Sequence, residues 1–141
     1  AEGERIPSPR RQRRGATMKV LIAEDDASVR QVLKNALSDA GYTILEAVNG
    51  LDALELFKQH NERIQLVITD VLMPQMNGRE LALLTSSMRS VHVLYISGHP
   101  RDEITHRGVL LDGVNFLAKP FEGKVLLYTV RQILTEQQIV H

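Results

Sequence analysis

Short apolar runs alternate with helical patterns along the chain from Met18 onward. Several of these runs are continuously apolar, which is typical of parallel strands that are covered on both faces. The predicted strands are Lys19–Ala23, Tyr42–Glu46, Leu66–Thr69, Val93–Ile96 and Val114–Leu117. Strands that alternate with helices predict an α/β fold with one doubly wound parallel sheet, and right-handed crossovers place helices on both of its faces.

The first helical pattern repeats apolar residues at the spacing of one helix face. Its members are Val29, Val32, Leu33, Ala36, Leu37 and Ala40. Gly41 follows them and indicates where the helix stops. We therefore expect this face of the helix to be buried.

Four further helices are predicted, from about Gly50 to His60, from near Asn77, over about Arg101 to Arg107, and from about Glu122. Asn49 is expected to cap the first of these, and Asn77 has capping-box spacing with Glu80. The side chains expected to face inward are Ala53, Leu54, Phe57, Leu126, Val130, Ile133 and Leu134.

Residues 1–17 differ in composition from the rest of the chain. Pro, Gly, Ser and Arg dominate there, and Ile6 is the only large apolar residue. Such a segment cannot bury enough surface to offset its ordering entropy, so we expect a flexible basic linker over 1–17 and one domain over 18–141. The linker holds five Arg and two Glu against 12 basic and 15 acidic residues elsewhere, so a net charge of zero conceals a mildly acidic body.

The composition excludes several classes of function. The 141 residues include no cysteine, which excludes a disulfide framework, a thiolate zinc site and a cysteine nucleophile and fits a reducing cytoplasm. No apolar run approaches the roughly 20 residues that span a bilayer, and no signal-peptide pattern opens the chain. The five histidines show no metal-ligand spacing. We therefore expect a cytoplasmic domain without membrane contact.

Carboxylates follow two of the predicted strands. Glu24, Asp25 and Asp26 come directly after the first strand, and Asp70 follows the third. The ligand crevice of an open α/β sheet lies beyond the carboxyl ends of its strands, so neighbouring strands would bring these groups together. Such a cluster is costly unless a cation or bound protons relieve it, and all-oxygen ligands suit Mg²⁺. Asp26 is expected to cap the following helix instead.

A hydroxyl and an ammonium are expected at the same edge of the sheet, because Ser97 follows the fourth strand and Lys119 the fifth. Pro120 favours an extended Lys119 and permits a cis peptide bond, which holds the ammonium where it can bind a phosphate or pair with a carboxylate. Asp70 can attack phosphorus and form an aspartyl phosphate. Mg²⁺ and Lys119 would neutralise the charge of the transferred group, and Ser97 can donate to one of its oxygens.

The stretches VLIAEDD, LVITDVLMPQMNG, VLYISG and FLAKPF resemble, in order and spacing, the response-regulator receiver domain of two-component signalling. The resemblance covers nearly all of residues 18–141. It implies a flavodoxin-like receiver fold with strand order 2-1-3-4-5 and five helices. It also implies that Asp70 is the phospho-acceptor, and that Glu24, Asp25, Asp70 and the backbone carbonyl of Leu72 hold Mg²⁺ (or Mn²⁺).

The same resemblance assigns Ser97 as a switch hydroxyl, Lys119 as a supporting lysine and Phe116 as a rotating aromatic. Phe116 lacks a hydroxyl, so a switch there works through packing, and a plain core Phe is the alternative. Leu72 and His99 lie two residues beyond the acceptor and the switch hydroxyl, where the family tunes hydrolysis. We hypothesise that the apolar Leu72 disfavours a well-placed attacking water and lengthens the life of the phosphoryl group.

The resemblance implies a histidine kinase or a histidine phosphotransfer domain as partner, and no nucleic acid bound by this domain. The stretch ISGHPRDEITHRGVL is similar to receivers at the C-terminus of hybrid sensor histidine kinases, whose kinase part is ATP-dependent and can be membrane-anchored. The chain ends soon after its last predicted helix, so we expect no DNA-binding output domain. A stand-alone response regulator is the alternative, and a degenerate receiver that serves only as an interaction module is another.

Two other classes fit the residues less well. A haloacid-dehalogenase-like phosphatase also uses an Asp after a strand, but it needs a second Asp two residues later, where Leu72 stands. A flavin- or nucleotide-binding module needs a Gly-rich loop after the first strand. The sequence there is EDDAS, whose charge would repel phosphate without a metal.

Overall fold

The computed structural model of the chain describes residues 18–60, 62–100 and 113–135. In these ranges five parallel strands form one sheet in the order β2-β1-β3-β4-β5, which confirms the predicted topology. The strands are β1 (Lys19–Ala23), β2 (Thr43–Ala47), β3 (Ile64–Asp70), β4 (His92–Ser97) and β5 (Phe116–Ala118). The edge strand β5 is shorter than predicted and starts two residues later.

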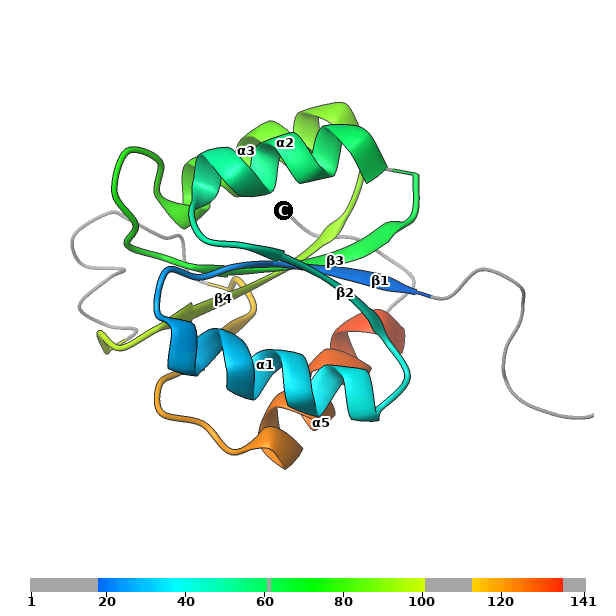
Figure 1. Cartoon of the computed structure of the whole chain (residues 1–141), viewed down its shortest axis with the longest axis vertical. Coiled ribbons are helices and arrows are strands. Elements are labelled where there is room, and N and C mark those ends of the chain that lie inside the picture. Colours follow the sequence, from blue (N-terminus) through cyan, green and yellow to red (C-terminus); the bar gives the residue numbers. More distant parts are fainter. Residues whose placement is uncertain (1–17, 61, 101–112, 136–141) are drawn as a thin grey trace, which may run out of the picture.

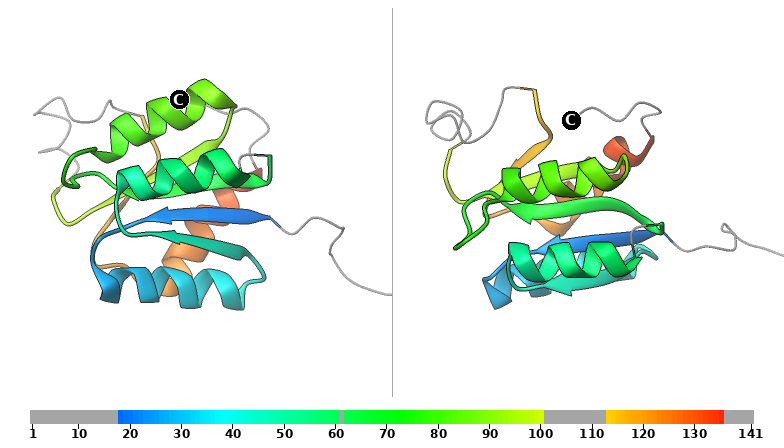
Figure 2. Two further views of the ribbon diagram at one scale, coloured as in Figure 1. Left: turned by 45° about the horizontal axis from the view of Figure 1, so that its top comes forward. Right: turned by 90° about the horizontal axis from the view of Figure 1, so that it is seen from above.

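Helices cover both faces of the sheet. The described helices are α1 (Ala27–Asp39), α2 (Gly50–His60), α3 (Gly78–Met88) and α5 (Gly123–Thr135). α1 and α5 lie against one face, and α2 and α3 lie against the other (Figures 1 and 2). The predicted helix over 101–107 and the predicted linker over 1–17 lie outside the described residues. Within the described part of the chain, no helix combines the length and the apolarity that crossing a membrane requires.

The core consists of two apolar layers, because alternate side chains of each strand point to opposite faces of the sheet. In β1, Val20 and Ile22 pack toward α1 and α5, whereas Leu21 and Ala23 pack toward α2 and α3. The helices contribute the predicted residues Leu33, Leu37, Ala53, Phe57, Leu126, Val130 and Ile133 as buried side chains. Leu54 and Leu134 are partly buried against the two layers.

Two residues predicted to face inward from α1 are exposed. Val32 is 44% exposed, because it lies about 100° around the helix from Leu33 and so at the margin of the apolar stripe. Ala40 is also exposed, because α1 ends at Asp39 and Ala40 is its C-cap. Gly41 follows with a φ of 97°, as the predicted stop signal requires.

The turn after β3 brings α3 close to the end of the strand that carries Asp70. The N–H of Gly78 donates to the carbonyl of Val71 at 2.8 Å, and Asn77 and Glu80 form the predicted capping box. A Cβ at position 78 would overlap the backbone carbonyl oxygen of Asp70. Only glycine therefore lets the first turn of α3 approach Asp70 this closely.

We predict that Gly78→Ala lowers the free energy of unfolding by about 1–3 kcal/mol, because the added methyl group must push the Asp70 backbone aside. Urea denaturation followed by circular dichroism measures the change. Gly98→Ala is the matched control, since a Cβ there has nothing within 4 Å, and its expected effect is below about 0.5 kcal/mol. Equal effects of the two substitutions would contradict this account of the turn.

Candidate functional site

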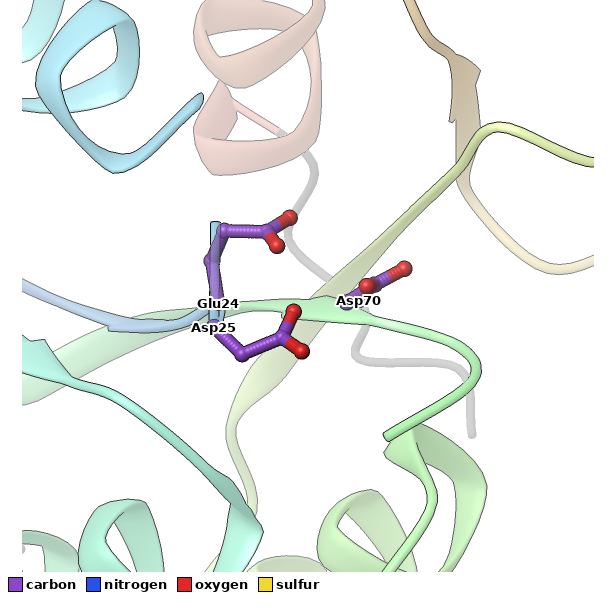
Figure 3. Close-up of side chains that lie close together, drawn as sticks. All are labelled: Glu24, Asp25 and Asp70. Carbon is purple, nitrogen blue, oxygen red and sulfur yellow. The ribbon is translucent and has the colours of Figure 1, made fainter. Parts of the chain in front are cut away.

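Three carboxylates meet at the carboxyl end of the sheet. β1 and β3 are neighbours, with Ala23 paired to Thr69, so the residues that follow them lie side by side. One ligand oxygen each from Glu24, Asp25 and Asp70 lies within 4.8 Å of the others. Figure 3 shows the three side chains gathered at this edge. The predicted convergence of carboxylates from two separate strands is confirmed.

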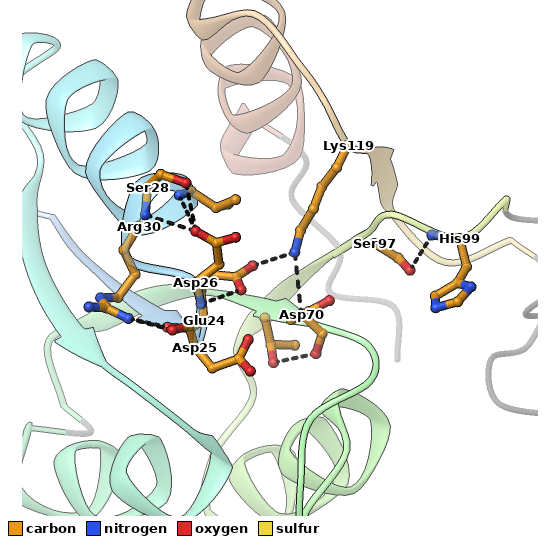
Figure 4. Close-up of polar contacts among 11 residues, drawn as sticks. Glu24, Asp25, Asp26, Ser28, Arg30, Asp70, Ser97, His99 and Lys119 are labelled. Atoms are coloured by element: carbon orange, nitrogen blue, oxygen red, sulfur yellow. Dashed lines mark hydrogen bonds and ion pairs between the residues drawn. The ribbon is translucent and has the colours of Figure 1, made fainter.

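The ammonium of Lys119 lies between two of these carboxylates. Its Nζ atom is 2.7 Å from Oε1 of Glu24 and 3.4 Å from Oδ2 of Asp70 (Figure 4). The backbone N–H of Lys119 donates to the carbonyl of Ser97 at 2.8 Å, and the peptide bond to Pro120 is cis. Lys119 is therefore held from β4 and reaches across the sheet edge as a carboxylate-pairing group.

Burial dominates the electrostatics of the acidic groups. It raises the pKa of Glu24 above its ordinary value, and pairing with Lys119 and the N–H of Asp26 opposes this only in part. It likewise raises the pKa of Asp70, again against the charge of Lys119. Burial alone would lower the pKa of Lys119, but Glu24 and Asp70 outweigh it and raise that pKa. Pairing thus favours the charged form of Lys119, while burial disfavours the charged forms of Glu24 and Asp70.

The cluster has the donor set of a hard divalent cation. One ammonium offsets only part of the charge of the three carboxylates. Among the described residues, Oε1 of Glu24 is buried and accepts no aligned hydrogen bond, so its contact with Lys119 is an ion pair. Oxygen-only ligands of this kind fit Mg²⁺ or Mn²⁺. Leu72, the predicted carbonyl ligand, lies in the turn two residues beyond Asp70 with its side chain 37% exposed.

Asp26 and Glu24 shape the loop that carries the acidic pair. Oδ1 of Asp26 accepts the N–H groups of Ser28 at 2.8 Å and Val29 at 3.3 Å, so Asp26 caps α1 as predicted. Hydrogen bonds from Ser28 and Val29 lower the pKa of Asp26. Oε2 of Glu24 accepts the N–H of Asp26 at 3.0 Å. Asp26 thus caps α1, whereas the carboxylates of Glu24 and Asp25 belong to the cluster with Asp70.

The two predicted switch residues lie on neighbouring strands and on the same face of the sheet. Ser97 ends β4 and is buried, and its Oγ accepts the N–H of His99 at 3.0 Å (Figure 4). Phe116 begins β5, pairs with Tyr95, and packs partly buried against the layer under α2 and α3. This placement brings the two residues near each other, and their role as a switch stays a prediction.

Arg30 of α1 contacts the loop that carries the acidic pair, and the sequence pattern alone did not identify it as part of the site. Its Nη1 donates to the backbone carbonyls of Glu24 at 2.8 Å and Asp25 at 3.2 Å (Figure 4). Its Nε lies 3.8 Å from Oε1 of Glu46 on β2. A basic side chain near the positive end of a helix is unfavourable by itself. That position was the signal in the sequence that Arg30 needs acceptors outside its own helix.

The strand order, the acidic cluster and the lysine after β5 together define a flavodoxin-like receiver fold. The profile of the response regulator receiver domain family matches residues 20–131, and the chain belongs to this family. It is therefore a receiver domain of two-component signalling. Receiver domains interact with histidine kinases or with phosphotransfer proteins.

Individual relatives agree with this assignment. The chain is 34% identical over 119 residues to the sensor kinase CckA of Brucella abortus. The aligned region covers 84% of this chain but only 13% of CckA. The crystal structure of the receiver domain of the hybrid histidine kinase CckA is 33% identical, with a TM-score of 0.70 over 83% of this chain and 99% of that one. The chemotaxis protein CheY4 of Vibrio cholerae is 30% identical, with a TM-score of 0.73 over 84% and 99%.

We predict that Lys119→Met raises the pKa of both Glu24 and Asp70 further, because the substitution removes a positive charge that opposes the effect of their burial. Carbon-detected NMR titration of the side-chain carboxyls measures both values. Lys34→Met is the control, since Lys34 pairs with Glu46, outside the cluster, at 3.0 Å. Unchanged pKa values of Glu24 and Asp70 in Lys119→Met would show that the ion pairs with Lys119 do not influence the ionisation of these carboxyls.

Proposed function

We propose that the chain accepts a phosphoryl group on Asp70 from a phosphohistidine, assisted by Mg²⁺. The donor would be a histidine kinase or a histidine phosphotransfer domain. The observation that carries the proposal is the meeting of Glu24, Asp25 and Asp70, two of which also pair with the ammonium of Lys119. Burial raises the pKa of Glu24 and Asp70, and perturbed acidic groups that gather at one strand edge support a functional site.

The chemistry follows from these groups. An oxygen of Asp70 forms a bond to phosphorus while the bond from phosphorus to the histidine nitrogen breaks, and the imidazole keeps the electron pair. Lys119 lies where it can stabilise the negative charge of the transferred group. Glu24, Asp25, Asp70 and the carbonyl of Leu72 would hold Mg²⁺. When bound, the ion supplies positive charge to the phosphoryl oxygens.

The output would be a change of packing. A phosphoryl group on Asp70 offers a new acceptor to the hydroxyl of Ser97, whose Oγ accepts the N–H of His99 in this structure. Movement of Ser97 toward it would leave space that Phe116 fills from the neighbouring strand. The surface that would respond comprises β5, α5 and the predicted helix over 101–107, which lies outside the described residues. This is a two-state element biased by one local charge.

The parent protein we favour is a hybrid sensor histidine kinase, with this receiver in the cytoplasm and without nucleic-acid or membrane contact of its own. The likeness to CckA supports it, because there the match is to a small part of a longer kinase chain. A stand-alone response regulator is the second candidate, and the match to nearly the whole of the CheY4 chain supports that one.

We predict that acetyl phosphate with Mg²⁺ labels the native domain and that Asp70→Asn abolishes the labelling, because an amide cannot form the acyl phosphate. Intact-protein mass spectrometry measures the added mass of the phosphoryl group. Asp39→Asn, at the exposed end of α1, is the control and should label normally. Labelling of Asp70→Asn at the native level would refute the assignment of the acceptor.

We also predict that Leu72→Asn shortens the life of the phosphoryl group severalfold. The side chain at this position is 37% exposed beside Asp70, so an amide there can orient a water molecule that an apolar group cannot. Loss of the label over time after removal of acetyl phosphate measures the rate. Leu83→Asn is the control, because Leu83 is an exposed leucine on α3 and is more exposed than Leu72. Equal rates for the native domain and Leu72→Asn would contradict the hypothesis.

A further inference from the structure

Arg30 connects three elements behind the acidic cluster. It belongs to α1, it donates to the carbonyls of the two residues that follow β1, and it faces Glu46 on β2. Its side chain is 19% exposed, and its bond to the Glu24 carbonyl is partly buried, whereas the bond to the Asp25 carbonyl is exposed. The Nη1 atom contacts both carbonyls at once, at 2.8 and 3.2 Å, and thereby fixes the orientation of the peptide units that carry Glu24 and Asp25.

The loop needs such a restraint because its side chains repel one another. Glu24, Asp25 and Asp70 place oxygens within 4.8 Å, and Lys119 contacts Glu24 and Asp70. The exposed Asp25 is free to turn toward water, which would lower the repulsion and remove one ligand from the cluster. The bond from Arg30 holds the backbone carbonyl of Asp25 and so restricts the directions that its side chain can take.

We propose that Arg30 is a positioning residue for the acidic pair. It holds the backbone of Glu24 and Asp25 so that both carboxylates stay directed at the cluster, and it thereby strengthens the binding of a divalent cation. This inference rests on the proposed function, because it presupposes that the cluster binds such a cation. Arg30 bonds to the backbone carbonyls of Glu24 and Asp25 and pairs with Glu46. Its effect on a cation would therefore be transmitted through Glu24 and Asp25.

Removal of Arg30 should change cation affinity in opposite directions, depending on whether Arg30 acts only through its charge or by positioning the metal ligands. A positive charge near a cation site weakens cation binding, so its removal would tighten binding if charge were its only effect. Loss of a group that orients metal ligands weakens binding, by about 10- to 100-fold in other metal sites. Lys34 offers a matched comparison. It lies one turn further along α1 and pairs with the same Glu46, and its side chain is 46% exposed.

The test is the affinity for Mn²⁺, measured by electron paramagnetic resonance of the free ion, with Mg²⁺ as competitor. We expect Arg30→Ala to bind Mn²⁺ about tenfold more weakly than the native chain. Arg30→Lys should fall between the two, because an ammonium keeps the charge but cannot reproduce the planar guanidinium that contacts both carbonyls and Glu46. Lys34→Ala should bind as tightly as the native chain or slightly more tightly.

Three results would overturn the inference: native or tighter affinity in Arg30→Ala, native affinity in Arg30→Lys, or equal weakening in Lys34→Ala. Circular dichroism establishes that each variant is folded, and if Arg30→Ala is not, the comparison of Arg30→Lys with Lys34→Ala decides. Failure of the proposed function looks different, since then the native chain itself would not bind Mn²⁺.

Discussion

Repulsion among carboxylates at the end of β1 and β3 is the constraint on which the rest of this structure depends. A sheet with this strand order necessarily brings the two strand ends together, and the sequence places acidic residues at both. The ammonium of Lys119, which follows β5 on the other side of β4, offsets part of this repulsion by pairing with Glu24 and Asp70. Burial keeps the pKa of Glu24 and Asp70 high nonetheless, so the pairing is incomplete. The negative charge that the ammonium leaves unpaired suits a hard divalent cation.

The surrounding structure holds each member of the cluster from a different direction. Gly78 lets α3 begin against the backbone of Asp70, and Arg30 contacts the loop after β1 from behind. The backbone of Lys119 is bonded to β4 through Ser97. Hydrogen bonds and strand pairing connect the end of β3 to Ser97 on β4 and to the neighbouring strand that carries Phe116.

The fold and most of the cluster could be predicted because they follow from local pattern and one topological rule. Continuous apolar runs predicted the strands, and the rule that ligands gather at their carboxyl ends predicted which residues would meet. Val32 was assigned to the wrong environment, because residues at the margin of an apolar stripe are buried or exposed according to the neighbouring helix. Arg30 was missed for a related reason. A basic residue near the start of a helix signals that acceptors are needed elsewhere, but two of the acceptors are backbone carbonyls, which the pattern of side chains does not identify.

The central claim is that side chains from two strands share one cation. Titration of the native chain with Mg²⁺, followed by carbon-detected NMR of the side-chain carboxyls, tests it most directly. The account predicts that the signals of Glu24, Asp25 and Asp70 shift together and saturate with one dissociation constant, while that of the capping residue Asp26 changes far less. Signals that stay unchanged, or that shift with separate dissociation constants, would contradict a shared site.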